Sequence, residues 1–184
     1  FSLEDIKDAV KFAHKHKAKV YVTMNVLPHN NDLDGLVEYL KYLESVHVDG
    51  IIASSMTIIN TCLNCAKKLE VHVSTQQSIA NSETCNYLQS LGAKRLVLAR
   101  ELSLKEIEKI RKNTDVGLEV FIHGGMCSSF SGRCMLSNHM VNRDANRGGC
   151  AQSCRWFYNL YNDKKEKVSD NLFTFSSKDL QAIK

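Results

Sequence analysis

The sequence has no apolar run as long as the roughly 18–20 residues that a membrane-spanning helix needs. Its start, Phe1-Ser2-Leu3-Glu4-Asp5, has no initiator Met and lacks the basic and apolar stretches of a signal peptide. It has no glycine-rich nucleotide-binding loop after the first predicted strand, no HExxH zinc-protease motif and no GxSxG nucleophile elbow. These absences argue against membrane, secreted and dinucleotide-binding proteins, and we expect a cytoplasmic protein without membrane contact.

The composition is that of an ordinary folded domain, with 184 residues of which 43% are hydrophobic and 24% charged. The net charge of +4 says little by itself, but it is unevenly distributed. Between His123 and Tyr158 four arginines stand against one acidic residue, Asp144. We therefore expect a polyanionic partner at this segment.

Helix and strand patterns alternate along the first two-thirds of the chain. Helices are expected after the capping box Ser2-x2-Asp5, after an N-cap at Asp32, over 57–69, over 82–91 up to Gly92, and after the capping box Ser103-x2-Glu106. Apolar, β-branched segments predict strands over 19–27, 49–54, 70–75, 95–99 and 117–122, with one more near 172–176.

Strands that alternate with helices every ~20–25 residues indicate βαβ units and a parallel sheet. Without a nucleotide-binding loop, this α/β repeat favours a TIM-like (β/α) barrel. A complete barrel needs roughly 250 residues, so we expect a partial barrel, a fragment of a longer chain that is inactive alone. The expected parts are barrel units over 1–122, a Cys/Arg-rich site segment inserted after a strand end over 123–160, and the start of another barrel unit over 161–184.

Four cysteines lie in the irregular, glycine-rich segment after the fifth predicted strand, namely Cys127, Cys134, Cys150 and Cys154. Active sites of barrels lie at the carboxyl ends of strands, and long irregular loops in compact domains are usually functional or disordered. Thiolates are ligands for iron–sulfur clusters and for zinc, and the spacing does not decide between them. The alternative is that these four are free thiols or form disulfides.

The other three cysteines have a structural interpretation. Cys62 and Cys65 form a C-x2-C pair inside an apolar helical pattern, and Cys85 lies on a helix face. Cysteine is among the most buried residue types, so we expect core thiols at these positions.

Four arginines accompany the cysteine segment, namely Arg133, Arg143, Arg147 and Arg155. Their guanidinium groups can bind phosphate or carboxylate with two parallel hydrogen bonds, or they can simply form a solvated surface. Aromatic residues from Trp156 to Tyr161 follow directly. Beside arginines such rings can stack on nucleic-acid bases, and they can equally anchor a core.

Further polar side chains lie at or just past the carboxyl ends of predicted strands, which converge on one face of a barrel. They are Asn25, Ser54, Ser55, Gln76, Gln77, Arg100, Glu101 and His123. Along the fifth strand Glu119, Phe121 and His123 should share a face. Glu119 is either a structural ion-pair partner or a catalytic group, and His123 is either scaffold or functional.

These considerations give two groups of candidates. Glu119, His123 and Arg133 are the catalytic candidates. The substrate-binding candidates are Gln76, Glu101, Arg143, Arg147 and Arg155.

The motifs also resemble a known family. The segments 119–127 (EVFIHGGMC) and 131–137 (SGRCMLS) closely resemble the signature of the peptidase U-32 family, often called collagenase-like. The likeness extends to 142–156 (NRDANRGGCAQSCRW), 74–76 (STQ), 98–101 (LARE) and 177–180 (SKDL). Members of this family begin with an earlier barrel strand and continue beyond the last of these motifs.

The resemblance implies an RNA-modifying enzyme, because several members use prephenate to hydroxylate the wobble uridine of tRNA or a cytidine of ribosomal RNA. The segment 142–156 is most similar to the tRNA branch. By that similarity, Cys127, Cys134, Cys150 and Cys154 would be the ligands of a 4Fe-4S cluster, with zinc as the alternative metal. Two alternatives stay open, a collagenase-like peptidase and a non-catalytic scaffold that carries a cluster or binds RNA.

Overall fold

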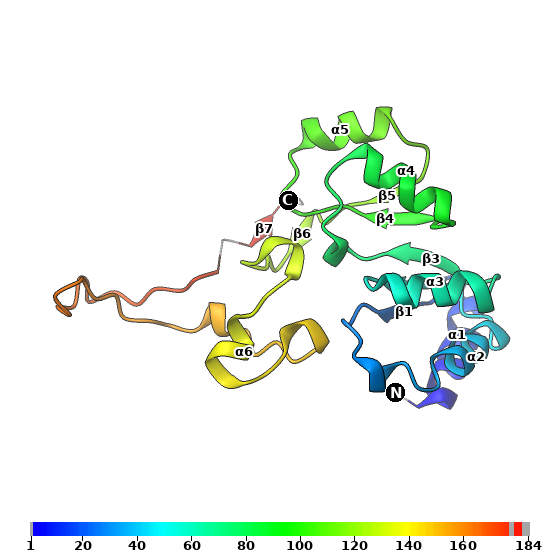
Figure 1. The fold of residues 1–184 in the computed structure, drawn as a ribbon, viewed down its shortest axis with the longest axis horizontal. Helices are drawn as coiled ribbons and strands as arrows, with labels where there is room; N and C mark the ends of the chain where they lie inside the picture. Colours follow the sequence, from blue (N-terminus) through cyan, green and yellow to red (C-terminus); the bar gives the residue numbers. More distant parts are fainter. Residues whose placement is uncertain (1, 177–178, 182–184) are drawn as a thin grey trace. The chain divides into compact units, whose positions relative to one another are not determined.

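The computed structural model describes residues 2–176 and 179–181, and the chain divides after Val120 into two compact units (Figure 1). The elements of the first unit are α1 (Leu3–Lys15), β1 (Tyr21–Met24), η1 (Asn30–Asp32), α2 (Leu36–Ser45), β2 (Gly50–Ala53), α3 (Met56–Cys65), β3 (Glu70–Val73), η2 (Thr75–Gln77), α4 (Ser82–Leu91), β4 (Arg95–Val97), α5 (Leu104–Lys112) and β5 (Gly117–Glu119). Those of the second unit are β6 (His123–Gly124), η3 (Phe130–Gly132), α6 (Leu136–Val141), η4 (Ala145–Arg147), η5 (Ser153–Arg155) and β7 (Leu180–Gln181).

The first unit is built on a parallel five-stranded sheet in which each strand pairs with the next strand of the chain. The order β1-β2-β3-β4-β5 never reverses, in contrast to a doubly wound sheet. Right-handed crossovers then place the connecting helices α2 to α5 on the same face of the sheet. This is the winding of a (β/α) barrel, so the predicted α/β class and partial barrel are confirmed.

The core of this unit lies between the sheet and its helices. Ile51 of β2 and Val71 of β3 are paired in register and almost completely buried. Leu40 and Leu43 of α2 and Ile59 of α3 cover them and are fully buried. Burial of each such side chain contributes about 1.5–3 kcal/mol, so packing of helices on the sheet is the main source of stability here.

Local capping signals explain where two of the helices begin. Ser2 and Ser103 form the predicted capping boxes at the starts of α1 and α5. The predicted cap at Asp32 is wrong, because Asp32 instead closes the short η1 turn by accepting the N–H of His29 at 2.7 Å. Helix α2 begins after Gly35, whose φ of +74° is a left-handed conformation that glycine adopts without strain.

Two strand predictions differ from the structure. The fifth strand ends at Glu119, so the alternation that would put Glu119, Phe121 and His123 on one face is not formed. Between 172 and 176 the structure has only an isolated bridge at Phe173, not a strand.

None of the helices within the described residues is both long and apolar enough to cross a membrane.

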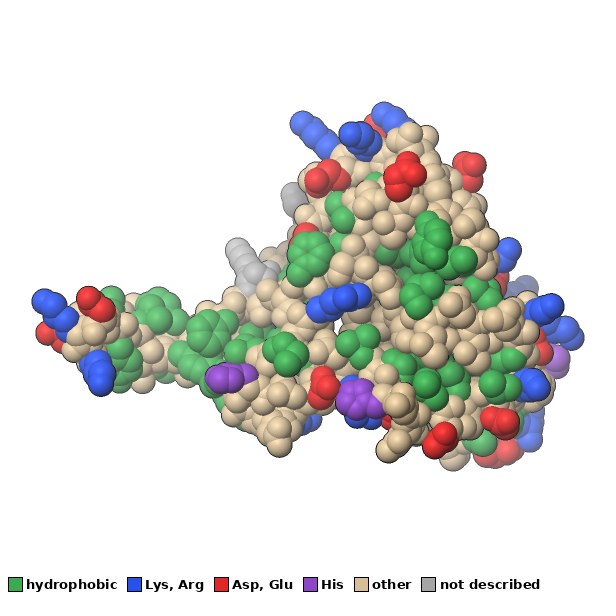
Figure 2. Space-filling view, in the orientation of Figure 1, with side chains coloured by type: hydrophobic (Ala, Val, Ile, Leu, Met, Phe, Trp, Pro, Cys, Tyr) green, Lys and Arg blue, Asp and Glu red, His purple; other side chains and the backbone are tan. Residues whose placement is uncertain are grey.

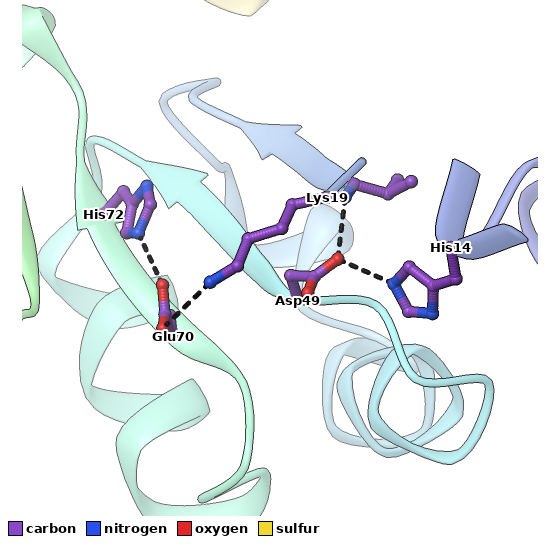
Figure 3. A network of polar contacts seen from close by, with 6 residues as sticks. His14, Lys19, Asp49, Glu70 and His72 are labelled. Carbon is purple, nitrogen blue, oxygen red and sulfur yellow. Dashed lines mark hydrogen bonds and ion pairs between the residues drawn. The ribbon is translucent and has the colours of Figure 1, made fainter. Parts of the chain in front are cut away.

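A polar network lies at the amino ends of β1 to β3 (Figure 3). The Asp49 carboxylate accepts hydrogen bonds from His14 Nε2 at 2.9 Å and from the Val20 N–H at 2.7 Å. Glu70 lies 3.1 Å from Nε2 of buried His72 and 3.8 Å from Lys19 Nζ. Barrel residues at this end of the strands serve stability rather than catalysis, and this network ties α1 to the sheet.

Candidate functional site

Two short strands frame the cysteine-rich unit. His123–Gly124 pairs antiparallel with Leu180–Gln181, so the start of the unit and its last described residues lie side by side. Gly124 has a φ of +115°, a conformation that only glycine adopts readily. The chain thereby turns directly into the segment that carries Cys127.

An ion pair links three segments of this unit. Arg155 Nη2 lies 2.6 Å from Asp179 Oδ1 and also donates to the carbonyl of Met126 at 3.2 Å. The N–H of Met126 donates to the same Asp179 oxygen at 3.2 Å. The pKa of Asp179 is lowered, chiefly by the hydrogen bond from Arg155 and then by that from Met126. Asp179 is a residue to which the sequence analysis gave no role.

Ser137 of α6 lies between two of the cysteines. It is 2% exposed, its hydroxyl donates to the Cys150 sulfur at 4.0 Å, and it accepts the Ala151 N–H at 3.0 Å. The Cys134 sulfur accepts the Leu136 N–H at 3.2 Å. Burial raises the pKa of Cys134, but hydrogen bonds from Ser129, Leu136 and Ser137 outweigh it, so the net pKa is lowered. This sulfur is therefore placed to carry negative charge.

Asn146 holds the backbone of Cys134. Its side-chain oxygen accepts the Cys134 N–H at 3.3 Å, and its side-chain nitrogen donates to the Cys134 carbonyl at 2.9 Å. The loop that carries Asn146 closes where the Gly149 N–H donates to the Asp144 carbonyl at 2.7 Å. A Cβ at Gly149 would lie only 2.6 Å from that carbonyl oxygen, so the turn requires glycine.

The four cysteines of this unit therefore fall into two pairs by their neighbours. Cys134 and Cys150 contact Ser137, whereas Cys127 and Cys154 adjoin Met126 and Arg155 in the chain. The donor set of thiols with N–H partners suits an iron–sulfur cluster or zinc. Among the described residues, however, no three His, Cys, Asp or Glu side chains are gathered as a metal-binding group. A shared site for all four cysteines stays a prediction.

The remaining cysteines are where the sequence analysis expected them. Cys62 and Cys85 are fully buried, and Cys65 packs against the same core. Burial raises the pKa of Cys62 to about 12, and it also raises the pKa of Cys85. These thiols are inert parts of the first unit.

The arginine and aromatic side chains differ in exposure. Arg133, Arg143 and Arg147 are exposed, and Arg155 is partly exposed and paired with Asp179. Tyr158 donates its hydroxyl to the Ser153 carbonyl at 2.7 Å and packs against Phe175 at 4.5 Å between ring centroids. Seven hydrophobic side chains along 157–175 are exposed, and Figure 2 shows that hydrophobic side chains lie on the surface of this part of the molecule. They are Phe157, Leu160, Tyr161, Val168, Leu172, Phe173 and Phe175.

In the first unit, hydrogen bonds join the loops at the carboxyl ends of the strands. The Ser54 hydroxyl donates to the Asn25 carbonyl at 2.8 Å, and Gln77 Nε2 donates to the Ser54 carbonyl. Thr75 Oγ1 donates to the carbonyl of Leu98 at 3.0 Å. Gln76 is half-buried in this row of loops and Glu101 is exposed, and their predicted substrate-binding roles stay predictions.

The catalytic candidates belong to different units. Glu119 ends β5 in the first unit, where its carboxylate lies 3.5 Å from Arg95, with both side chains nearly half exposed. His123 is exposed in β6, and Arg133 follows η3, both in the second unit. The ion pair favours the structural interpretation of Glu119, and catalytic roles for His123 and Arg133 stay predictions.

Comparison with known proteins identifies the family. The model of peptidase family U32 matches residues 1–184. The chain therefore belongs to peptidase family U32. A solved U32 peptidase, Mk0906, has the same fold with a TM-score of 0.62 at 19% identity, over 91% of this chain and 69% of that one.

Two curated relatives carry the names of RNA-modification proteins. The chain is 48% identical to tRNA hydroxylation protein P1 of Bacillus subtilis, over 100% of this chain and 45% of the relative. It is 38% identical to the 23S rRNA 5-hydroxycytidine C2501 synthase of Escherichia coli, over 97% of this chain and 27% of the relative. The chain thus spans less than half the length of either relative.

Proposed function

We propose that this U32 chain is part of an enzyme that hydroxylates RNA, with a tRNA wobble uridine as the target and prephenate as the small-molecule substrate. The observation that carries the proposal is the 48% identity, over the whole chain, to a protein named for tRNA hydroxylation. The relative named for a ribosomal 5-hydroxycytidine supports the reaction class, because it too places a hydroxyl group on a pyrimidine.

We further propose that Cys127, Cys134, Cys150 and Cys154 hold a 4Fe-4S cluster, with zinc as the alternative. The support is that the sulfurs of Cys134 and Cys150 accept N–H and O–H hydrogen bonds, which are the interactions that stabilise and tune cluster thiolates. A bound cluster supplies electron transfer to the site.

The substrate contacts follow from charge and exposure. Arg133, Arg143 and Arg147 are exposed beside the cysteines and can form paired hydrogen bonds with RNA phosphates or with the two carboxylates of prephenate. Phe157 and Tyr161 are 72% and 60% exposed, so their rings are available to stack on unpaired bases. Replacing each of these arginines by glutamine should weaken tRNA binding and flatten its salt dependence.

The first experiment is anaerobic purification of the full-length protein, with visible absorption and with iron, sulfide and zinc content. Broad absorption near ~400 nm with iron and sulfide is expected for cysteine-bound clusters. A colourless protein with one tightly bound zinc would replace the cluster by a structural or hydrolytic zinc site. A colourless protein without metal would overturn the metal proposal.

The second experiment is nucleoside analysis of tRNA from a deletion strain that carries wild type, Cys134→Ala or Cys65→Ala. We expect hydroxylated uridine with wild type and Cys65→Ala, but not with Cys134→Ala, because Cys65 packs against the core outside the site. Hydroxylation that survives in Cys134→Ala would refute the cluster. If the protein holds a cluster but deletion of its gene leaves RNA hydroxylation unchanged, the scaffold alternative is favoured. If the pure protein cleaves denatured collagen and Cys127→Ala abolishes this cleavage, the peptidase alternative is favoured.

A further inference from the structure

The backbone just before Cys127 is fixed at both of its polar groups. The Met126 N–H donates to Asp179 and the Met126 carbonyl accepts from Arg155, each at 3.2 Å. Within the described residues, the segment around Cys127 belongs to no helix or strand, and these two hydrogen bonds fix the backbone of the residue next to it. A change that removes either partner releases the chain next to the thiol.

Cys154 is fixed through its own backbone and lies next to Arg155 in the chain. It directly precedes Arg155 in the short η5 helix, and its carbonyl accepts the N–H groups of Phe175 and Ser176, each at 2.9 Å. These two residues lead into the segment that carries Asp179. The 2.6 Å contact between Arg155 and Asp179 therefore closes a ring of segments that contains both cysteines.

Electrostatics agree with this geometry. The pKa of Arg155 is raised, first by the hydrogen bond to Asp179 and to a lesser degree by the charges of Cys154 and Cys127. Both thiols thus lie within electrostatic range of one guanidinium group.

The other two thiols are organised separately. The Ser137 hydroxyl and backbone contact Cys150 and Cys134, and neither contact involves Arg155 or Asp179. The unit therefore contains two independently organised pairs of thiols. Any metal site that used all four cysteines would be assembled from these two halves.

We propose that Arg155 and Asp179 are positioning residues, which hold Cys127 and Cys154 together as one half of the thiol site while Ser137 holds Cys134 and Cys150 as the other. This inference deepens the proposed cluster site and rests on it for its biological purpose. It gives Arg155 a task other than contact with substrate.

The test is chemical cross-linking in the full-length protein, reduced and metal-free, with a short bismaleimide that joins two thiols. Proteolysis and mass spectrometry then give the yields of the 127–154 and 134–150 linked peptides. We compare wild type, Asp179→Asn, Asp179→Glu, Arg155→Lys and Ser137→Ala. Circular dichroism confirms that each variant is folded.

Asp179→Asn should lower the 127–154 yield roughly threefold, the order expected for a half-exposed ion pair with an added backbone hydrogen bond. It should leave the 134–150 yield unchanged. Ser137→Ala should lower the 134–150 yield and leave the 127–154 yield unchanged. Asp179→Glu should keep part of the 127–154 yield that Asp179→Asn loses. Arg155→Lys should give a 127–154 yield between those of wild type and Asp179→Asn. The two pairs thus serve as controls for each other.

The inference is overturned if Asp179→Asn and Arg155→Lys both leave the 127–154 yield unchanged, or if they lower both yields equally, as general loosening would. Iron content of the wild-type protein answers the separate question of the proposed cluster. If wild type binds iron but the variants leave both cross-linking yields unaltered, only the positioning role is refuted. If the variants lower the 127–154 yield selectively but wild type holds no iron, only the proposed cluster is refuted.

Discussion

Replacing Asp49 by alanine should lower the free energy of unfolding by about 2–3 kcal/mol, from the loss of two hydrogen bonds to a charged acceptor. The larger part is the 2.7 Å bond from the Val20 N–H, because this partly buried backbone donor loses its partner. The hydrogen bond from His14 adds less, because the His14 side chain is 39% exposed and the Asp49 side chain is 20% exposed, so water competes for this contact.

The assay is urea unfolding at pH 7, followed by circular dichroism. Asp8→Ala is the matched control, because Asp8 lies on the same helix as His14 but makes only a weak contact. Its side chain is 68% exposed, and its carboxylate lies 3.8 Å from the Lys11 ammonium group. We expect it to cost no more than about 0.5 kcal/mol. If Asp49→Ala were no more destabilising than Asp8→Ala, the network of Figure 3 would not be what fastens α1 to the sheet.

The same carboxylate gives a pH dependence with a defined sign. Burial raises the pKa of Asp49, but hydrogen bonds from His14 and Val20 outweigh it, so the folded pKa lies below the ordinary value of 3.8. The unfolded state then takes up the proton first as pH falls. The Asp49 contribution to stability should be complete above the ordinary pKa, should decline as pH falls from that value towards the lower folded pKa, and should be gone below the folded pKa. Wild type and Asp49→Ala should therefore converge in stability only in strong acid.

Two further predictions concern a glycine and a buried thiol. Gly149→Ala should lower iron per protein severalfold, because its Cβ would lie 2.6 Å from the Asp144 carbonyl oxygen and displace the loop that holds Cys134 through Asn146. Full iron content would contradict this account of the turn. Cys62 should resist iodoacetamide at pH 8 in the folded protein and react after unfolding in urea, because burial raises its pKa to about 12 and denies access. Labelling of Cys62 in the native state would show that α3 opens.

Features that depend on neighbours in the chain were predictable from the sequence. The capping boxes at Ser2 and Ser103 need only a partner three residues away, and both are present. The alternation of apolar strands with helices predicted the parallel sheet, because strands of a parallel sheet are buried on both faces of the sheet and therefore read as apolar runs. Asp32 failed as a cap because the chain has a second way to begin α2, through Gly35 in a left-handed conformation.

The site was predictable in composition but not in arrangement. The cysteines and arginines stand out by type and spacing, and the resemblance to U32 proteins rests on them. Asp179 lies 24 residues beyond Arg155, and no local period connects the two. Asn146 is likewise one polar residue among many in a loop until its amide is seen against the Cys134 backbone. Contacts of this kind follow from the path of the chain, which local patterns do not specify.

The sequential strand order also bears on how the chain matures. Each strand from β2 to β5 pairs with the strand made just before it, so each pairing can form once the second of its two strands has been made. During synthesis, the sheet can therefore grow strand by strand as the chain emerges from the ribosome. The thiols of Cys127 and Cys154 and their partner Asp179 are translated only afterwards. Loading of the proposed metal centre would then be a late step in biogenesis, performed on a protein whose first unit is already folded.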